Sequence, residues 1–460
     1  MAKMMVSRQM TSNSKLCFPV PTTTAFRLVT NASPSAASES ACSAYERYVR
    51  LPELKMLWSL REFPAWRNEG ILRPALSAVE ITFRLVSTVF SDTRTYINQR
   101  RCGRRLESLL ASQIAIISQL VEAEAADPDT RGTAPIVDAA SSGALLPARE
   151  GSHAEIWKTA GDVVTVVCRA CEGSLLPRLG AWRKSEDVAR RIMFSIECYM
   201  GRCPYTLGIG EPNLTGKPNL DYDSVCRPTK LGLLNKSPIV SESLENQAVY
   251  STHQILECWI HAGMEILTRH VVANIENKRY KQASDGCDMV VQIWKLLSEV
   301  EDLLLLADPE DLLRLRAQLL AGPSENTPAC FRSRGLVELT KRCSDVRHKV
   351  PEILGVEADP MGGPRVQEAA MRLYREGKRE GKGEVELLQG MQSVEKGMKS
   401  FYYGYKQLMV TVMGSLEANG NRAVMCDDPL AQIFLEPTYF PSLDAAKTFL
   451  GSRWTLSPVV

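Results

Sequence analysis

The sequence lacks the features of a membrane-spanning, secreted or strongly charged protein. No apolar run reaches the roughly 18 residues that a spanning helix needs. The 55 Lys and Arg residues nearly balance the 53 Asp and Glu residues, and a net charge of +2 favours neither nucleic acid nor a membrane surface as a partner. The 13 cysteines are scattered, and no hydrophobic secretory segment is visible. We therefore expect reduced thiols in a cytosolic or nuclear protein.

Motifs that define common enzyme classes are missing as well. The sequence contains no P-loop, no H-E-x-x-H and no Ser/His/Asp arrangement. The stretch 208–210 (GIG) is not a dinucleotide fingerprint, because no strand pattern precedes it and no third glycine follows at the required position. Cys168 and Cys171 have zinc-type spacing, but Cys198 and Cys203 are too far apart to supply the second pair. We interpret Cys168 and Cys171 as core thiols on a helix.

The pattern that dominates the chain is helical. Apolar residues recur with the spacing of an amphipathic helix, and alternation typical of strands is nearly absent. Order is expected to begin at 42–58, and the predicted helical segments are 73–90, 104–126, about 153–175, 182–202, 245–278, 288–307, 308–320, 334–350, 364–380, 384–414 and about 442–451. The sequence therefore predicts an all-α fold, a large helical bundle around a shared core.

Composition divides the chain into four parts. Residues 1–41 form a basic tail that is rich in Ser and Thr, and we expect it to be flexible. Residues 42–202 form an N-terminal helical region, interrupted at 125–152 by a disordered loop rich in Ala, Pro, Gly, Ser and Asp. Residues 203–243 are dense in Gly, Pro and Asn and predict an irregular ordered segment. Residues 244–455 form a C-terminal helical region.

One helix carries an unusual polar stripe. Three of the five histidines lie within 250–270, and His253, Glu257, His261 and Glu265 follow one another at four-residue spacing. On a helix these side chains share one face. A two-metal carboxylate centre would need Glu-x-x-His pairs on other helices, and the sequence has none. The spacing therefore favours a solvated stripe with i,i+4 pairs for most of these residues.

Several long blocks resemble the plant nematode-resistance HSPRO family. The blocks are CSAYERYVRLPELKMLW, SDTRTYINQR, RCPYTLGIGEPNLTGKPNLDYDSVCRP, DPEDLLRLRAQL, VEADPMGGPRVQEAAMRLY and FLEPTYFPSLDAAKTFLG. They run from about residue 42 to residue 451, so the resemblance covers nearly the whole chain. It implies a soluble plant protein of basal defence and stress response that contacts subunits of the SNF-related energy-sensing kinase complex.

A second, more distant resemblance concerns the last half of the chain. The stretch THQILECW (252–259) looks like the T-H-Q-x-x-E-x-W segment of haem-dependent tryptophan dioxygenases. The stretches 293–315 and 330–339 look like later helices of these enzymes, in the same order. The resemblance implies a helical fold of the tryptophan/indoleamine dioxygenase type. It places His253 at the distal haem position and Trp259 in the ligand pocket.

The dioxygenase site is not matched in full. The iron-binding histidine falls on Tyr405, and a tyrosinate favours ferric iron whereas oxygen binding needs ferrous iron. Phe331 and Ser333 match the substrate-binding segment, but the arginine that clamps the substrate carboxylate falls on Val337. The loop that closes over the substrate is replaced by 415–424. We therefore expect the scaffold to persist without the dioxygenase chemistry.

Three hypotheses follow from these observations. The preferred one is a non-catalytic regulator of plant defence that works through protein contacts, with no nucleic acid, membrane or obligatory cofactor. The second is a protein that binds haem, or an indole-like ligand, with His253 and Tyr405 as distal and axial residues. The third is a purely structural protein whose core around His253 is filled by side chains.

Overall fold

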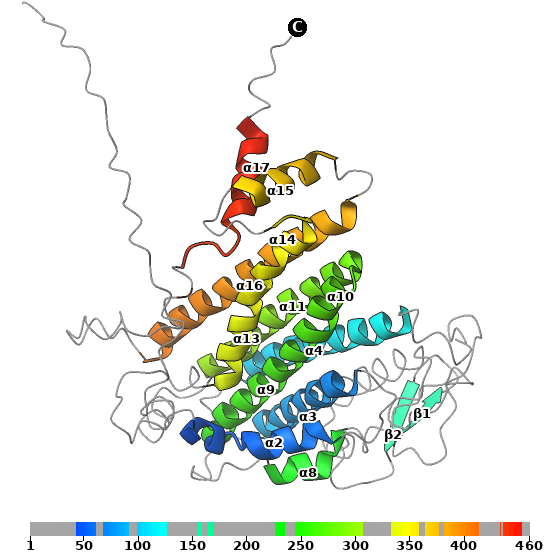
Figure 1. Cartoon of the computed structure of the whole chain (residues 1–460). Coiled ribbons are helices and arrows are strands. Elements are labelled where there is room, and N and C mark those ends of the chain that lie inside the picture. Colours follow the sequence, from blue (N-terminus) through cyan, green and yellow to red (C-terminus); the bar gives the residue numbers. More distant parts are fainter. Residues whose placement is uncertain are drawn as a thin grey trace, which may run out of the picture.

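Helices make up nearly all of the structure that the computed structural model describes (Figure 1). Most predicted helical segments lie within these helices, which confirms the helical class. The structure describes residues 43–60, 68–91, 99–126, 154–158, 164–168, 226–234, 244–306, 333–357, 364–376, 381–413, 433 and 436–452. The predicted helices at 182–202 and 308–320 lie outside the described residues.

In the described part of the chain, a helical turn at 43–48 is followed by three helices of the N-terminal region and by a short helix in the segment 203–243. Their bounds are α2 Leu51–Ser59, α3 Glu69–Ser91, α4 Gln99–Ala126 and α8 Pro228–Leu234. The helix α8 falls within 203–243, the segment predicted to be irregular. α3 packs against α4 and α8, so the N-terminal helices and the chain just before the C-terminal region share one core.

A two-stranded hairpin corrects one helix prediction. β1 (Ala154–Lys158) pairs antiparallel with β2 (Val164–Cys168), and Ala154 lies opposite Cys168. The prediction of a helix at about 153–175 is therefore wrong at these residues. Because 163–167 reads VVTVV, four of its five side chains are valines and the other is threonine, and β-branched side chains favour strands over helices. Cys168 consequently lies on a strand and not on a helix.

The C-terminal region begins with one long continuous helix. α9 (Leu244–Ile266) passes through a π-helical turn (Leu267–Val272) into α10 (Ala273–Glu276), as the pattern at 245–278 predicts. α11 (Tyr280–Glu301) then runs into a 3₁₀ turn (Asp302–Leu306). The π-helical turn packs against α11.

The remaining helices complete the bundle. α13 (Arg334–Asp345) continues through a 3₁₀ turn into α14 (Val350–Ile353), and α15 spans Pro364–Glu376. α16 (Lys382–Met413) is the longest helix of the described part, and α17 spans Pro441–Ser452. α15 and α17 pack on each other at one edge of the molecule (Figure 1).

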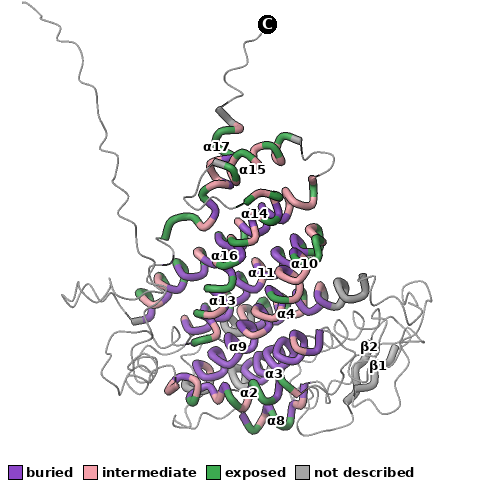
Figure 2. Tube along the Cα trace, in the orientation of Figure 1, coloured by how far each residue is buried: buried purple, intermediate pink, exposed green. Residues whose placement is uncertain are grey.

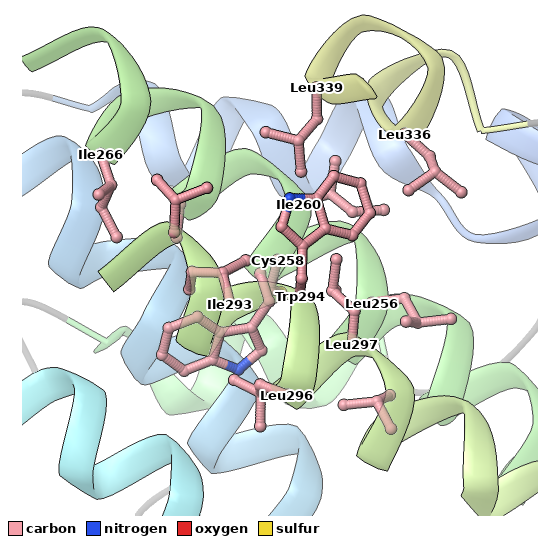
Figure 3. Packing of buried hydrophobic residues seen from close by; sticks show 14 of the residues in the cluster. Leu256, Cys258, Ile260, Ile266, Ile293, Trp294, Leu296, Leu297, Leu336 and Leu339 are labelled. Atoms are coloured by element: carbon pink, nitrogen blue, oxygen red, sulfur yellow. The ribbon is translucent and has the colours of Figure 1, made fainter. Parts of the chain in front are cut away.

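The central helices form a stack in the order α3, α9, α11 and α16 (Figure 1). Each helix of the stack packs on the next, and the buried residues concentrate along it (Figure 2). Figure 3 shows where aliphatic side chains of α9, α11 and α13 meet. The buried side chains from both halves of the chain belong to one continuous cluster. None of the described helices is long and apolar enough to cross a membrane.

The contact between α11 and α16 depends on glycines spaced seven residues apart. A Cβ atom on Gly390 would lie 2.9 Å from Cβ of Cys287, and one on Gly397 would lie 3.5 Å from Cβ of Trp294. Both pairs advance by seven residues in the same direction, so the two helices run parallel. The absence of a side chain at Gly390 lets their backbones approach closely.

The glycine spacing continues one step beyond this contact. Gly404 lies seven residues after Gly397, but no atom of the described residues would come within 4 Å of a Cβ atom there. At this level α11 gives way after Glu301 to the 3₁₀ turn Asp302–Leu306. Gly404 therefore has an exposed surface position with open space beside it.

The two glycines give a matched pair of substitutions. Gly404→Ala should raise the free energy of unfolding by up to about 1 kcal/mol, because alanine favours a helix over glycine and the space is open. Gly390→Ala should lower it by roughly 1–2 kcal/mol, because the clash with Cys287 outweighs the same gain. Urea denaturation measures both. Equal effects of the two substitutions would contradict the close packing of α11 and α16.

Candidate functional site

His253 lies in the centre of the stack, enclosed by side chains of the N-terminal segment. Its side chain is 1% exposed, and its Nδ1 lies 2.8 Å from the carbonyl oxygen of Val249. Because a carbonyl only accepts, Nδ1 carries the proton and donates it to this bond. The rings of Tyr45 and Tyr48 approach the imidazole edge-on, at centroid distances of 5.8 and 6.1 Å. Burial lowers the pKa of His253 to about 4, so the ring is neutral at pH 7.

Glu257, one turn further along α9, is equally buried. The hydroxyl of Tyr45 donates a hydrogen bond of 3.0 Å to its Oε1, and Ser333 supplies a second hydrogen bond. Burial raises the pKa of Glu257, and the two hydrogen bonds act against this rise. The carboxyl group therefore ties α9 both to the N-terminal segment and to the start of α13.

Ser333 has a clear structural role. Its Oγ accepts a 3.1 Å hydrogen bond from the backbone N–H of Leu336, which makes it the N-cap of α13. Its side chain is buried beside Glu257. One hydroxyl thus caps a helix and binds a buried carboxyl group, and both interactions are internal.

Trp259 joins three helices through a chain of buried hydrogen bonds. Its Nε1 donates to Oε1 of Gln113 on α4 at 3.0 Å, and Nε2 of Gln113 donates to Oγ1 of Thr82 on α3 at 2.9 Å. The hydroxyl of Thr82 in turn donates to the carbonyl of Ala78. The indole nitrogen is therefore satisfied within the protein, and Trp259 acts as a core residue.

The second half of the polar stripe lies closer to solvent. His261 stacks on Trp58 with a centroid distance of 5.0 Å, and burial lowers its pKa. Glu265 forms an i,i+4 ion pair of 2.8 Å with Arg269. The prediction of a solvated stripe is thus confirmed for Glu265 and only in part for His261, which is partly buried. It is wrong for Glu257, which is 2% exposed. The described residues contain no group of three or more potential ligands that could hold a metal ion.

The residues that the dioxygenase resemblance singles out are not brought together as a haem site. Tyr405 is buried on α16, but α11 lies between α16 and α9. Trp294 of α11 occupies the space one turn before Tyr405, with ring centroids 5.3 Å from Phe401 and 6.2 Å from Tyr402. A haem held by His253 and Tyr405 would have to displace α11. These residues therefore do not fit the group.

The substrate-binding positions fit no better. Val337, where the resemblance needs an arginine, is 45% exposed on the outer face of α13. A side chain at this position is open to solvent, whereas His253 is buried. Phe331 lies outside the described residues. Of the other predicted pocket residues, Trp259 lies on α9 with the stripe, and Ser333 lies beside it through its bond to Glu257.

The residues that hold α9 in place were not predicted. Tyr45, Tyr48 and Gln113 stand far from α9 in the sequence, and Gln254 binds the carbonyl of Val49 at 3.1 Å. Tyr48 also meets Tyr250 edge-on, at 5.4 Å. A usable signal was present in the helical spacing of Tyr45 and Tyr48 just before α2, since two aromatic residues three apart share one face.

The fold and the site define a large helical protein whose central histidine, glutamate and tryptophan belong to an internal hydrogen-bond network. Comparison with models of protein families assigns this protein to a family. The model described as Hs1pro-1 N-terminus matches residues 1–197, and the model described as Hs1pro-1 protein C-terminus matches residues 200–456. The chain therefore belongs to the Hs1pro-1 family of nematode-resistance proteins, as the HSPRO resemblance predicts.

Two relatives from Arabidopsis thaliana extend over nearly the whole chain. Nematode resistance protein-like HSPRO2 is 46% identical over 447 residues, which cover 96% of this chain and 94% of the relative. Nematode resistance protein-like HSPRO1 is 46% identical over 427 residues, which cover 92% of each chain. No solved structure matches the chain. The dioxygenase-type fold therefore stays a prediction.

The depressed pKa of His253 predicts a pH-dependent stability. The imidazole binds its proton near pH 6.5 when unfolded but near pH 4 when folded. The contribution of His253 to the free energy of unfolding is therefore complete above pH 6.5. It is lost as the pH falls towards 4, and the total loss is roughly 3 kcal/mol. His253→Asn, which keeps a donor for Val249, should remove this slope. Urea unfolding between pH 4.5 and 7.5 compares the two proteins.

Glu257 provides a check on this comparison. Its raised pKa acts in the opposite direction, because stability is lost as the pH rises from its unfolded value through its folded one. This contribution is common to both proteins and cancels in their difference. Parallel pH profiles for the two proteins would contradict the enclosure of His253.

The packing around Tyr405 predicts the outcome of a haem titration. Addition of hemin to the purified protein should give no Soret band that depends on Tyr405. Tyr405→Phe and the exposed control Tyr403→Phe should have the spectrum of the unsubstituted protein. A Soret band that Tyr405→Phe abolishes and Tyr403→Phe retains would refute our assignment of Tyr405 to the core.

Proposed function

We propose that this protein is a non-catalytic regulator of plant defence and stress response that acts through protein–protein contacts in the cytosol or nucleus. Family membership supports the defence role, because two relatives that match over nearly their whole length are named nematode resistance protein-like. The candidate partner is the SNF-related energy-sensing kinase complex, which the family resemblance implies.

The observation that carries the non-catalytic part of the proposal is the internal use of the central polar residues. A general acid or base must come within hydrogen-bond reach of a substrate atom. His253 and Glu257 are 1% and 2% exposed, and both are bonded within the protein. Burial is the largest cause of both pKa shifts, and the charges of Lys55 and Glu46 have smaller, opposing effects on the pKa of Glu257. This pattern is typical of a polar core and not of a reactive site.

The proposal includes a scaffold related to the haem dioxygenases in the C-terminal half. Its support is the T-H-Q-x-x-E-x-W stretch, which lies on a long helix, and the long helix that carries Tyr405. The contacts of His253 and Tyr405 do not favour haem or an indole ligand as the function of this scaffold. Protein contact is the role that uses the exposed surface and leaves the core intact.

A pull-down with two proteins tests the proposal. Tagged full-length chain, with folding confirmed by circular dichroism, should enrich kinase-complex subunits from plant extract over a tag-only control. Folded His253→Asn should enrich them equally, because His253 serves the interior. If the folded, unsubstituted chain enriches no subunit, the proposal that the kinase complex is the partner is wrong. Loss of defence activity in folded His253→Asn that still binds its partner would argue for a chemical role.

A further inference from the structure

The segment 436–440 is fastened to α16 by one buried carboxylate. Glu395 accepts hydrogen bonds from the backbone N–H of Tyr439 at 2.9 Å and from the hydroxyl of Thr438 at 3.4 Å. Lys399 forms an ion pair of 2.8 Å with the same Glu395 and donates to the carbonyl of Glu436 at 2.9 Å. These contacts hold the segment beside α16 and leave a space between them.

That space is an open groove with a volume of about 530 Å³. On one side it is lined by α16, and on the other by the segment and the start of α17. A hydrogen bond of 2.6 Å from Nε2 of Gln392 to Oδ1 of Asp444 joins the two walls. The lining residues are Gln392, Glu395, Lys396, Lys399, Ser400, Tyr403, Thr438 and Asp444.

The residues of the α16 wall form a stripe along the helix, and this stripe continues beyond the groove to Val410. Gln392, Lys396, Lys399 and Tyr403 follow one another at intervals of four, three and four residues, and Val410 lies two turns after Tyr403. Tyr403 is 54% exposed and Val410 is 39% exposed, although both are large apolar side chains. Apolar residues seven apart on one exposed helix face are typical of a helix-binding surface.

The charge of this surface indicates the chemistry of its partner. From residue 396 to residue 413, α16 contains three lysines and neither Asp nor Glu. Lys399 is neutralised by Glu395, whereas Lys396 is exposed and has no ion pair with the described residues. A complementary segment would therefore present carboxylates beside Lys396 and apolar side chains over Tyr403 and Val410.

We propose that this groove and stripe form the docking surface for an acidic amphipathic helix of a partner protein. Gly404 lies beside Tyr403, and no described residue would come within 4 Å of a Cβ atom there, which allows the partner backbone to approach α16 closely. α16 already receives α11 in this way at Gly390. The inference deepens the proposed function by placing the partner contact, and it can be tested without the kinase complex.

The direct test uses a defined probe. A fluorescein-labelled peptide of about 20 residues, with Leu on one helical face and Glu on the other, is titrated with the full-length protein. Anisotropy should report binding that weakens with added salt, whereas the same peptide with Lys for Glu should not bind. Tyr403→Asp and Val410→Asp should each weaken binding about tenfold, as expected for central contacts. Lys396→Glu should weaken it as well, through charge reversal.

Two exposed apolar residues elsewhere supply matched controls. Met56 on α2 is 62% exposed and Leu233 on α8 is 73% exposed. Met56→Asp and Leu233→Asp should leave peptide binding unchanged. Equal binding by Tyr403→Asp and the two controls, or no binding of the acidic peptide, would overturn the proposal. So would concentration-dependent self-association that Tyr403→Asp abolishes, because a second copy would then be the occupant.

The kinase pull-down separates this inference from the function on which it rests. If the unsubstituted chain enriches kinase subunits and Tyr403→Asp enriches them equally, the α16 surface is not the contact and the proposed function stands. If the acidic peptide binds as expected but no kinase subunit is enriched, the surface stands and the kinase link fails.

Discussion

The hydrogen bond from Tyr45 to Glu257 joins parts of the chain that are 212 residues apart. A buried carboxyl group is costly unless its oxygens are bonded, and removing one partner would leave the other buried and unsatisfied. The polar face of α9 is therefore compatible with the interior only when the N-terminal segment covers it. The turn at 43–48 and the start of α13 meet this condition together, through Tyr45 and Ser333.

Much of the fold was predictable because amphipathic helices give a local periodicity of apolar residues in the sequence. The segments at 73–90, 104–126, 245–278 and 384–414 all lie almost entirely within observed helices. The pattern at 153–175 does not separate strand from helix, because a short apolar run fits either period and only the β-branched side chains of β2 favour a strand. The spacing of apolar residues predicts secondary structure well. It does not do so where the same short pattern fits both a helix and a strand.

The candidate site was harder to predict, for a physical reason. A polar stripe at four-residue spacing looks the same whether water or another part of the chain covers it. What distinguishes His253 and Glu257 from Glu265 is the presence of Tyr45 and Tyr48, which no local window contains. Similarly, the sequence places Tyr405 on a long helix but cannot show that α11 lies between this helix and α9. Burial of a single side chain is a property of the whole fold.

The continuous core has a consequence for how such a protein can change over evolutionary time. The two family models divide the chain near residue 200, yet the turn at 43–48 packs on α9 and α3 packs on the same helix. A gene fission or an alternative transcript that cut at this boundary would release two fragments, each with half of a hydrophobic interior facing water. Selection should therefore keep the two halves within one reading frame, because each half supplies the cover for the other's apolar surface.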